Sequence, residues 1–348
     1  MDIDAATILT ERLRRQRLTE PLEDPKGYTE LFRLLQPVPP GVRPGDPPRM
    51  VHRTVFDDGA VADQMREERI IVKGRFLGGN IGYVLAEDLE LYANAFRRPL
   101  SGLNETQQTV LDAIRYAETL TPRQIKGETE LLNKQIMPAL HRLQQAFLVY
   151  EDQVDSDWER NWYEFAIEWP DIHLAEEKWE MAAAQVLLRF LQGNVFATFE
   201  QLKDWSGLPS RSLATLVSDM EGNSSLVPRV VEGLGEGWIC PQDASLKSRK
   251  ASSSVFMLHR SDILARSHAS ELKRRFGHRE ILQYLLIDGA FQGVVLGHWR
   301  IGPHDVEDIA VELPAAERTN RRDEIVNAVA WQYRPPHNRI LRYDGREL

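Results

Sequence analysis

Thr121-Pro-Arg-Gln-Ile-Lys126 and Thr198-Phe-Glu-Gln-Leu-Lys203 are two versions of one motif, separated by an offset of 77 residues. The threonine, the glutamine and the lysine are identical in both versions, and the same offset pairs Leu131 with Leu208. Self-similarity at a fixed period indicates a duplicated structural unit. The shape of this unit therefore decides the fold of much of the chain.

Each unit is predicted to contain three helices followed by a strand pair. Asn104 followed by Gln107 has the pattern of a capping box, and Thr121 followed by Pro122 has the pattern of a second helix start. A third helix is expected over 131–145, and β-rich runs follow at 147–150 and 162–167. The second unit repeats this order, with helices over 177–192, 198–205 and 210–220 and strands over 226–231 and 238–240.

Three helices followed by a hairpin form the layout of a winged helix-turn-helix. In that layout the third helix lies in the major groove of DNA and the hairpin is the wing. On the third helices, Lys134, Arg142 and Arg211 are then candidate DNA contacts. Units of this kind also serve as protein–protein contacts, so a protein partner is the alternative.

A more divergent copy is predicted to precede these two units. Its expected helices are 5–18, 28–36 and 59–68, and its expected strands are 69–73 and 81–85. Lys73 and Arg75 belong to this strand pair and are candidate DNA contacts. The loop 36–48 interrupts the copy, because its prolines cannot donate helical hydrogen bonds.

The C-terminal part has a different pattern. A basic, serine-rich linker is expected over 245–254, followed by helices over 261–275 and 315–331 and by strands over 255–259, 280–287, 291–299 and 306–313. These strands predict a small antiparallel β-barrel or sheet. The expected class is therefore α+β, with tandem winged helix-turn-helix units and a C-terminal barrel. The predicted domains are 1–100, 101–173, 174–244 and 255–348.

Composition narrows the class of protein. The 348 residues contain 42% hydrophobic side chains and a single cysteine, Cys240, so an internal disulfide is excluded. We expect no metal, no cofactor, no membrane span and no export signal, which indicates a cytoplasmic protein, taken as a monomer. The net charge of −9 argues against a protein that coats DNA, because lysine and arginine supply much of DNA affinity. Local basic clusters still permit a salt-sensitive DNA binder.

Several segments together resemble the bacterial AlkZ/YcaQ-type DNA glycosylase family. The matching segments are 15–21 with 34–36, 81–89, and 286–293 with 297–300. The resemblance implies a protein that binds double-stranded DNA, damaged or distorted, and hydrolyses the N-glycosidic bond of an alkylated purine. Base excision repair and self-resistance to a toxin are the implied roles, and no cofactor is implied.

The catalytic motif of that family has two departures in this chain. The family pattern is Gln-Φ-Gln or Gln-Φ-Asp, in which the first side chain holds the water and the second assists. Here the motif is Gln36-Pro37-Val38, and a valine has no polar atom with which to orient water. The family's Arg-Gly-Thr-x-His run corresponds to 78–82 and lacks both the arginine and the histidine.

Two interpretations of this site stay open. In the first, Gln36 is catalytic, Asp46 supplies the replacement carboxylate, and basic residues bind phosphate. The candidates for phosphate or DNA contact are Arg43, His52 and Arg53 in the loop region and His298 and Arg300 in the C-terminal hairpin. In the second, Gln36 bonds the backbone of the proline loop and Asp46 caps a turn. Whether the chain is an enzyme, a non-catalytic winged-helix DNA-binding or regulatory protein, or a protein–protein interaction module is left undecided.

Overall fold

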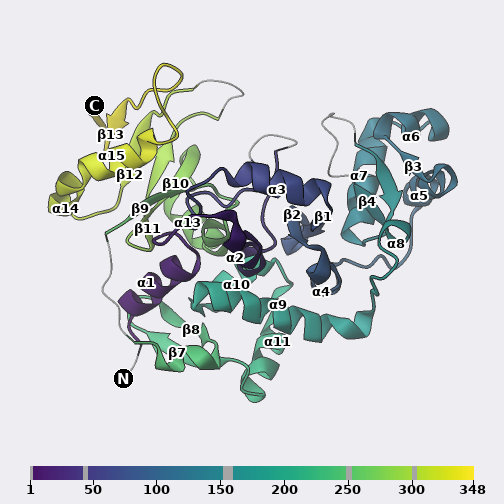
Figure 1. Cartoon of the computed structure of the whole chain (residues 1–348), viewed down its shortest axis with the longest axis horizontal. Helices are drawn as coiled ribbons and strands as arrows, with labels where there is room; N and C mark the ends of the chain where they lie inside the picture. The colour runs from purple at the N-terminus through teal and green to yellow at the C-terminus, as the bar shows by residue number, and fades with distance from the viewer. Residues whose placement is uncertain (1–2, 42–45, 152–159, 248–252, 300–303) are drawn as a thin grey trace.

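The computed structural model describes residues 3–41, 46–151, 160–247, 253–299 and 304–348. The first part of the chain builds a helical layer with one hairpin (Figure 1). Its elements are α1 (Ala5–Arg15), η1 (Pro25–Gly27), α2 (Tyr28–Leu35), α3 (Asp58–Glu67), β1 (Ile71–Phe76), η2 (Leu77–Gly79), β2 (Asn80–Leu85), η3 (Ala86–Asp88) and α4 (Leu89–Phe96). Strands β1 and β2 are antiparallel, and Ile71 pairs with Leu85.

Two sets of elements with the same order follow. The first set contains α5 (Glu105–Ala117), β3 (Thr119–Leu120), α6 (Pro122–Thr129), α7 (Asn133–Gln145), β4 (Val149–Glu151), β5 (Trp162–Glu164) and α8 (Phe165–Glu168). The second contains η4 (Glu176–Lys178), α9 (Trp179–Asn194), β6 (Phe196–Ala197), α10 (Phe199–Ser206), α11 (Ser210–Gly222), β7 (Val227–Val231), β8 (Gly235–Ile239) and η5 (Pro241–Ser245). Their sheets have the orders β3-β5-β4 and β6-β8-β7.

The repeated motif has the same local structure in both sets. Thr121 and Thr198 each accept a hydrogen bond from the backbone of the glutamine three residues later, and that glutamine caps the threonine in return. This satisfies two of the free N–H groups at each helix start. Helices α6 and α10 both end at a residue in the left-handed region, Glu130 and Gly207. The offset of 77 residues therefore holds for the backbone geometry as well as for the sequence.

One predicted strand is shorter than expected. The run 162–167 is extended only over β5, and the chain then turns into α8. The backbone N–H of Phe165 donates to the carbonyl of Leu148, and the Phe165 ring packs against Phe147 with its edge. Packing of this ring ends the ladder that the β-rich composition predicted.

Of the two C-terminal architectures that the sequence left open, a barrel or a sheet, the barrel is wrong, because the strands form an open sheet. Its strands are β9 (Val255–Leu258), β10 (Ile281–Ile287), β11 (Ala290–Leu296), β12 (Asp308–Val311), β13 (Arg342–Tyr343) and β14 (Arg346–Glu347), in the order β14-β13-β12-β11-β10-β9. The helices of this part are α12 (Ile263–Ser267), α13 (Ala269–Phe276), α14 (Ala315–Asn320) and α15 (Arg322–Ala330). Closure would require β14 to pair with β9, and the last two strands contain two residues each, too few for such a ladder.

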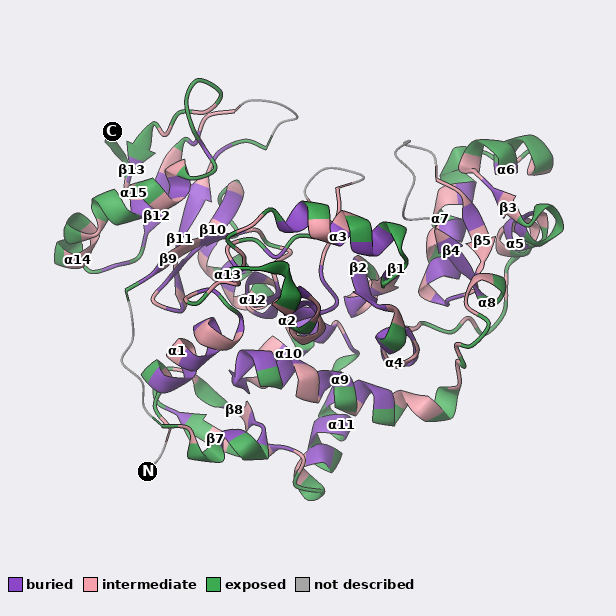
Figure 2. Ribbon diagram, in the orientation of Figure 1, coloured by how far each residue is buried: buried purple, intermediate pink, exposed green. Residues whose placement is uncertain are grey.

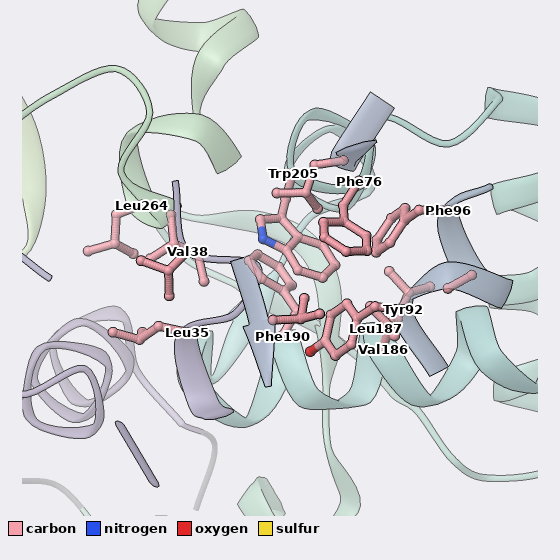
Figure 3. Packing of buried hydrophobic residues seen from close by; sticks show 14 of the residues in the cluster. Leu35, Val38, Phe76, Tyr92, Phe96, Val186, Leu187, Phe190, Trp205 and Leu264 are labelled. Atoms are coloured by element: carbon pink, nitrogen blue, oxygen red, sulfur yellow. The ribbon is translucent and has the colours of Figure 1, made fainter. Parts of the chain in front are cut away.

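The core is shared between distant parts of the sequence. One large cluster joins α2, α4, α9, α10 and α12, whereas α5–β5 have a separate core of their own (Figure 2). In the shared core, Phe190 of α9 and Trp205 of α10 stack with ring centroids 4.3 Å apart. Figure 3 shows these rings beside Phe76 of β1 and Phe96 of α4. The first hairpin is thereby packed onto the second of the two similar sets.

The described helices contain none that is both long and apolar enough to cross a bilayer.

Candidate nucleic-acid interface

The start of the proline loop lies along strand β2. The N–H of Val38 donates to the carbonyl of Tyr83 over 2.9 Å, and the N–H of Tyr83 donates to the carbonyl of Val38 over 2.8 Å. Gly82 permits this close approach, because a Cβ at that position would lie 2.9 Å from the Cβ of Pro37. The loop is therefore held in place by backbone pairing, and its prolines border a hollow in the surface.

Gln36 is buried, with 2% of its surface exposed, and both ends of its amide are engaged. Its Nε2 donates to Oδ2 of Asp88 over 2.6 Å, and its Oε1 accepts from the N–H of Leu85 over 2.8 Å. Asp88 also pairs with Arg189 of α9 over 2.7 Å. Gln36 thus connects the loop, the first hairpin and α9. Val38 is also buried, with 2% exposed.

A cleft of about 340 Å³ opens in front of this loop. One wall is formed by Pro37, Pro39, Pro40 and Gly41, a second by Leu77, Asn80 and Ile81 of the first hairpin, and a third by the segment 259–266. Trp299, which follows β11, stands at its border with 61% of its surface exposed. A volume of this size lies within the range of small-ligand sites.

The charge of the cleft is positive. Arg260 is exposed, and none of the described side chains forms an ion pair or hydrogen bond with its guanidinium group. Arg266 donates to the carbonyl oxygens of Trp205 and Leu77 over 2.8 and 2.6 Å. Among the described residues, no aspartate or glutamate lines the cleft. An exposed indole beside the exposed Arg260 suits a base and a phosphate.

His259 adds a polar group to the same wall. Its Nδ1 lies 2.7 Å from Oγ of Ser261. Burial lowers the pKa of His259, with the nearby charge of Arg260 acting in the same direction. The imidazole is therefore mainly neutral at pH 7.

The sequence did not point to the arginines of this cleft. Arg260 and Arg266 lie at the start of a predicted helix, where isolated basic residues are ordinary. Only the packing of α12 against α10 brings them to the proline loop. Trp299 lies in the hairpin that the sequence did single out.

Two predicted phosphate contacts of the loop region are engaged with protein. Arg53 is 1% exposed, and its Nη1 and Nη2 donate to Asp262 over 2.7 and 3.1 Å. His52 contacts the carbonyl of Met257 through Nε2 over 2.9 Å, and its ring packs on Trp331. These side chains attach the loop region to the C-terminal part.

The basic residues of the first hairpin are directed toward the following unit. Lys73 is 5% exposed and pairs with Glu151 of β4 over 2.7 Å. Burial lowers the pKa of Lys73 to about 8, against the opposing effect of Glu151. Arg75 donates to Oε1 of Gln144 in α7 over 2.8 Å. Both arrangements connect β1 to the neighbouring unit.

The remaining candidates are distributed over the surface. Lys134 and Arg211 are exposed near the starts of α7 and α11, and Arg142 is exposed and donates to Gln145 over 3.0 Å. His298 lies between Glu280 and Glu307. Asp46 lies beside Gly41, outside the lining of the cleft. Arg43 and Arg300 fall outside the described residues.

No group of three or more histidine, cysteine, aspartate or glutamate side chains in the described ranges is arranged to hold a metal ion.

An α+β chain whose cleft, among the described residues, is lined by arginines without carboxylates and bordered by an exposed tryptophan has the chemistry of a nucleic-acid-binding protein. The chain belongs to the DNA glycosylase AlkZ-like family, whose model matches residues 51–283. Its fold is similar to that of the Streptomyces sahachiroi DNA glycosylase AlkZ, with a TM-score of 0.69 and 14% identity. That similarity covers 95% of this chain and 96% of the other. No curated protein sequence matches the chain.

Proposed function

We propose that this protein binds duplex DNA containing an alkylated purine and hydrolyses the N-glycosidic bond of that base. The observation that carries the proposal is the cleft beside the Gln36-Pro37-Val38 motif, with Arg260 and Trp299 at its border. Arg260 would bind a backbone phosphate, and Trp299 would stack on an unpaired base. Membership in the glycosylase family supports the same reaction.

The proposed hydrolysis requires few chemical groups from the protein. Water adds to the sugar carbon as the bond from carbon to the base nitrogen breaks, and the base leaves with the bonding electrons. A purine alkylated at a ring nitrogen is already positively charged, so it departs as a neutral molecule without protonation. The protein must position the water and stabilise positive charge on the sugar. The water's proton passes to a base, and we propose the carboxylate of Asp46 for this role, because Asp46 lies against Gly41 at the edge of the cleft.

The wider DNA contact is proposed to follow the winged helix-turn-helix layout. Lys134 and Arg142 on α7 and Arg211 on α11 are exposed near the positions where such helices meet phosphate. These three side chains would contribute charge without reading sequence.

A strand-cleavage assay for abasic sites on duplex DNA carrying N7-alkylated purines tests the activity. We expect abasic sites with the wild-type protein. Trp299→Ala should weaken binding about tenfold, because one base–aromatic stack contributes about 1–3 kcal/mol. Arg260→Ala should lower the slope of log affinity against log salt by about one. Arg346→Ala, an exposed arginine on the opposite edge strand β14, is the control and should change neither quantity. Intact DNA at saturating protein would refute the hydrolysis.

Recognition without cleavage is the second candidate function, and the contacts of Gln36 favour it. Both ends of this amide are bonded to protein and the side chain is 2% exposed, so its second N–H and its second oxygen lone pair are shielded from bulk water. A protein of this kind would bind the lesion and leave the DNA intact.

Gln36→Ala separates a structural role from a catalytic one. Removal of the amide leaves the Asp88 carboxylate and the Leu85 N–H without this partner inside the protein, at a cost of about 2–4 kcal/mol in the free energy of unfolding. Urea unfolding measures this loss. Unchanged stability together with abolished cleavage would instead make Gln36 a catalytic residue. Asp46→Asn in the same assay tests the proposed base.

A further inference from the structure

A second hollow lies behind the proline loop. This cavity of about 110 Å³ shares Pro39, Pro40, Gly41 and the 259–263 segment with the cleft. Its walls are mainly apolar, with Val38 on one side and Met257 of β9 on another. The cavity therefore adjoins the cleft directly and has the more apolar lining of the two.

Two polar side chains that line this cavity have a buried atom without a hydrogen-bond partner among the described residues, the donor Nε of Arg53 and the acceptor Oε1 of Gln283. Gln283 of β10 lines the cavity, is 6% exposed, and its Oε1 has no hydrogen-bond partner among the described residues. The hydroxyl of Tyr333 bonds to the same side chain. An amide oxygen buried without a partner costs about 1–3 kcal/mol, which a ligand N–H group would recover.

An irregularity in the sheet lies next to Gln283. The register between β10 and β11 shifts between Ile281 and Gln283, and both Leu282 and Gln283 are buried. Regular alternation would place these neighbours on opposite faces of the sheet. Bulges of this kind redirect a side chain and occur often beside functional sites. Gln283 lies directly beside this shift and lines the cavity.

We propose that this cavity holds the hydrogen-bonding edge of an extruded nucleobase, with Gln283 Oε1 accepting from its exocyclic amine. The inference rests on the proposed binding of DNA in the cleft. A lining that is apolar over most of its area and includes the unpaired acceptor of Gln283 suits a flat heterocycle that carries an N–H group. A dry cavity of about 150 Å³ holds benzene, so 110 Å³ takes the edge of a purine while the rest of the ring lies toward the cleft.

Three duplexes that differ only at one position test the inference. The position carries adenine, unsubstituted purine or a tetrahydrofuran abasic analogue, each opposite a second abasic analogue so that extrusion requires no base-pair opening. Wild-type protein should bind the adenine duplex about tenfold more tightly than the purine duplex, since only adenine has the exocyclic amine. Gln283→Leu should abolish this preference while leaving affinity for the tetrahydrofuran duplex unchanged.

Gln292→Leu on the neighbouring strand β11 is the matched control, because it makes the same substitution outside the cavity. It should keep the tenfold preference. Val51→Trp, at a cavity-lining position with 37% exposed surface, should remove the preference by filling the space. Thermal unfolding of each variant verifies the fold.

The outcomes separate this inference from the proposed function. Wild-type binding of all three duplexes with equal affinity would overturn the base pocket and retain DNA binding, with the cavity then holding only water. Preference retained in Gln283→Leu would likewise overturn it. If the wild-type protein binds none of the duplexes, the proposed function fails and the inference fails with it.

Discussion

At Gly207, which is not itself part of the cleft lining, the addition of a single methyl group should displace a segment that lines the cleft. Gly207 ends α10 with φ 64° and ψ 19°, and its N–H donates to the carbonyl of Lys203 over 2.8 Å. A Cβ built there would lie 2.6 Å from the Cα of Gly78 and 2.8 Å from its nitrogen. These atoms are backbone, so no side chain can rotate out of the way. Gly207→Ala must therefore displace the turn of the first hairpin.

Two effects contribute to the expected loss in the free energy of unfolding. The left-handed backbone costs an alanine about 1 kcal/mol, and overpacking against a rigid neighbour typically costs about 1–3 kcal/mol more. We expect Gly207→Ala to lower the free energy of unfolding by about 2–4 kcal/mol. Glu130 occupies the equivalent cap of α6 at φ 59°, which indicates that the backbone conformation alone is tolerated.

Urea unfolding followed by tryptophan fluorescence is the assay, because Trp205 lies two residues before Gly207. Gly233→Ala is the matched control: Gly233 has φ +82°, and nothing lies within 4 Å of a Cβ there. That control should cost only about 1 kcal/mol. Leu77 beside Gly78 lines the cleft, so Gly207→Ala should also weaken DNA binding. Equal losses in both variants would refute rigid packing of the hairpin on α10.

Two further predictions concern buried cations. The pKa of Lys73 is about 8 in the folded protein and 10.5 as the ordinary value, so the unfolded chain binds more protons between these values. The free energy of unfolding should therefore rise from pH 8 to 10.5 by up to about 3 kcal/mol, and Lys73→Met, measured by urea unfolding at each pH, should remove this rise. Arg12 is buried and donates to the carbonyls of Asn194 and Phe196 over 2.9 Å each. Arg12→Met should cost about 2–4 kcal/mol in thermal or urea unfolding, whereas an equal loss in the more exposed Arg14→Met would contradict a specific role.

Much of the secondary structure was predictable because its signals are local. The Asn104 and Thr121 caps, the Pro122 helix start and the apolar spacing of α7 each act within a few residues. The strands expected over 280–287 and 291–299 correspond to β10 and β11, which pair with each other. Failures arose where packing overrode composition, as at Phe165, where a ring contact replaced strand pairing.

The open sheet was not predictable from strand patterns. Alternation describes which face of a strand is buried, and an open sheet and a closed barrel give the same alternation. Closure depends on whether the first and last strands meet. That meeting is a long-range property, and here β9 and β14 remain at opposite edges.

The candidate site, like the fold, could be predicted from the sequence only in part. The Gln36-Pro37-Val38 motif drew attention to a loop beside which a cleft opens, and its role as a catalytic site stays a prediction. Basic residue type alone was a poor guide to exposed charge. Lys73 and Arg53 are buried in ion pairs with Glu151 and Asp262, and a sequence contains no signal for partners so distant.

By itself, the sequence determined the repeat, the helix starts and the family, because capping chemistry, periodicity and motif order are readable along the chain. Only the tertiary structure decided that Arg260, Trp299 and Pro37 border one cleft, and that Gln36 is bonded inside the protein. The physical reason is that packing of α9, α10 and α12 into one core brings distant segments together. A local pattern specifies each element, but the proximity of two elements follows from the surfaces they bury against each other.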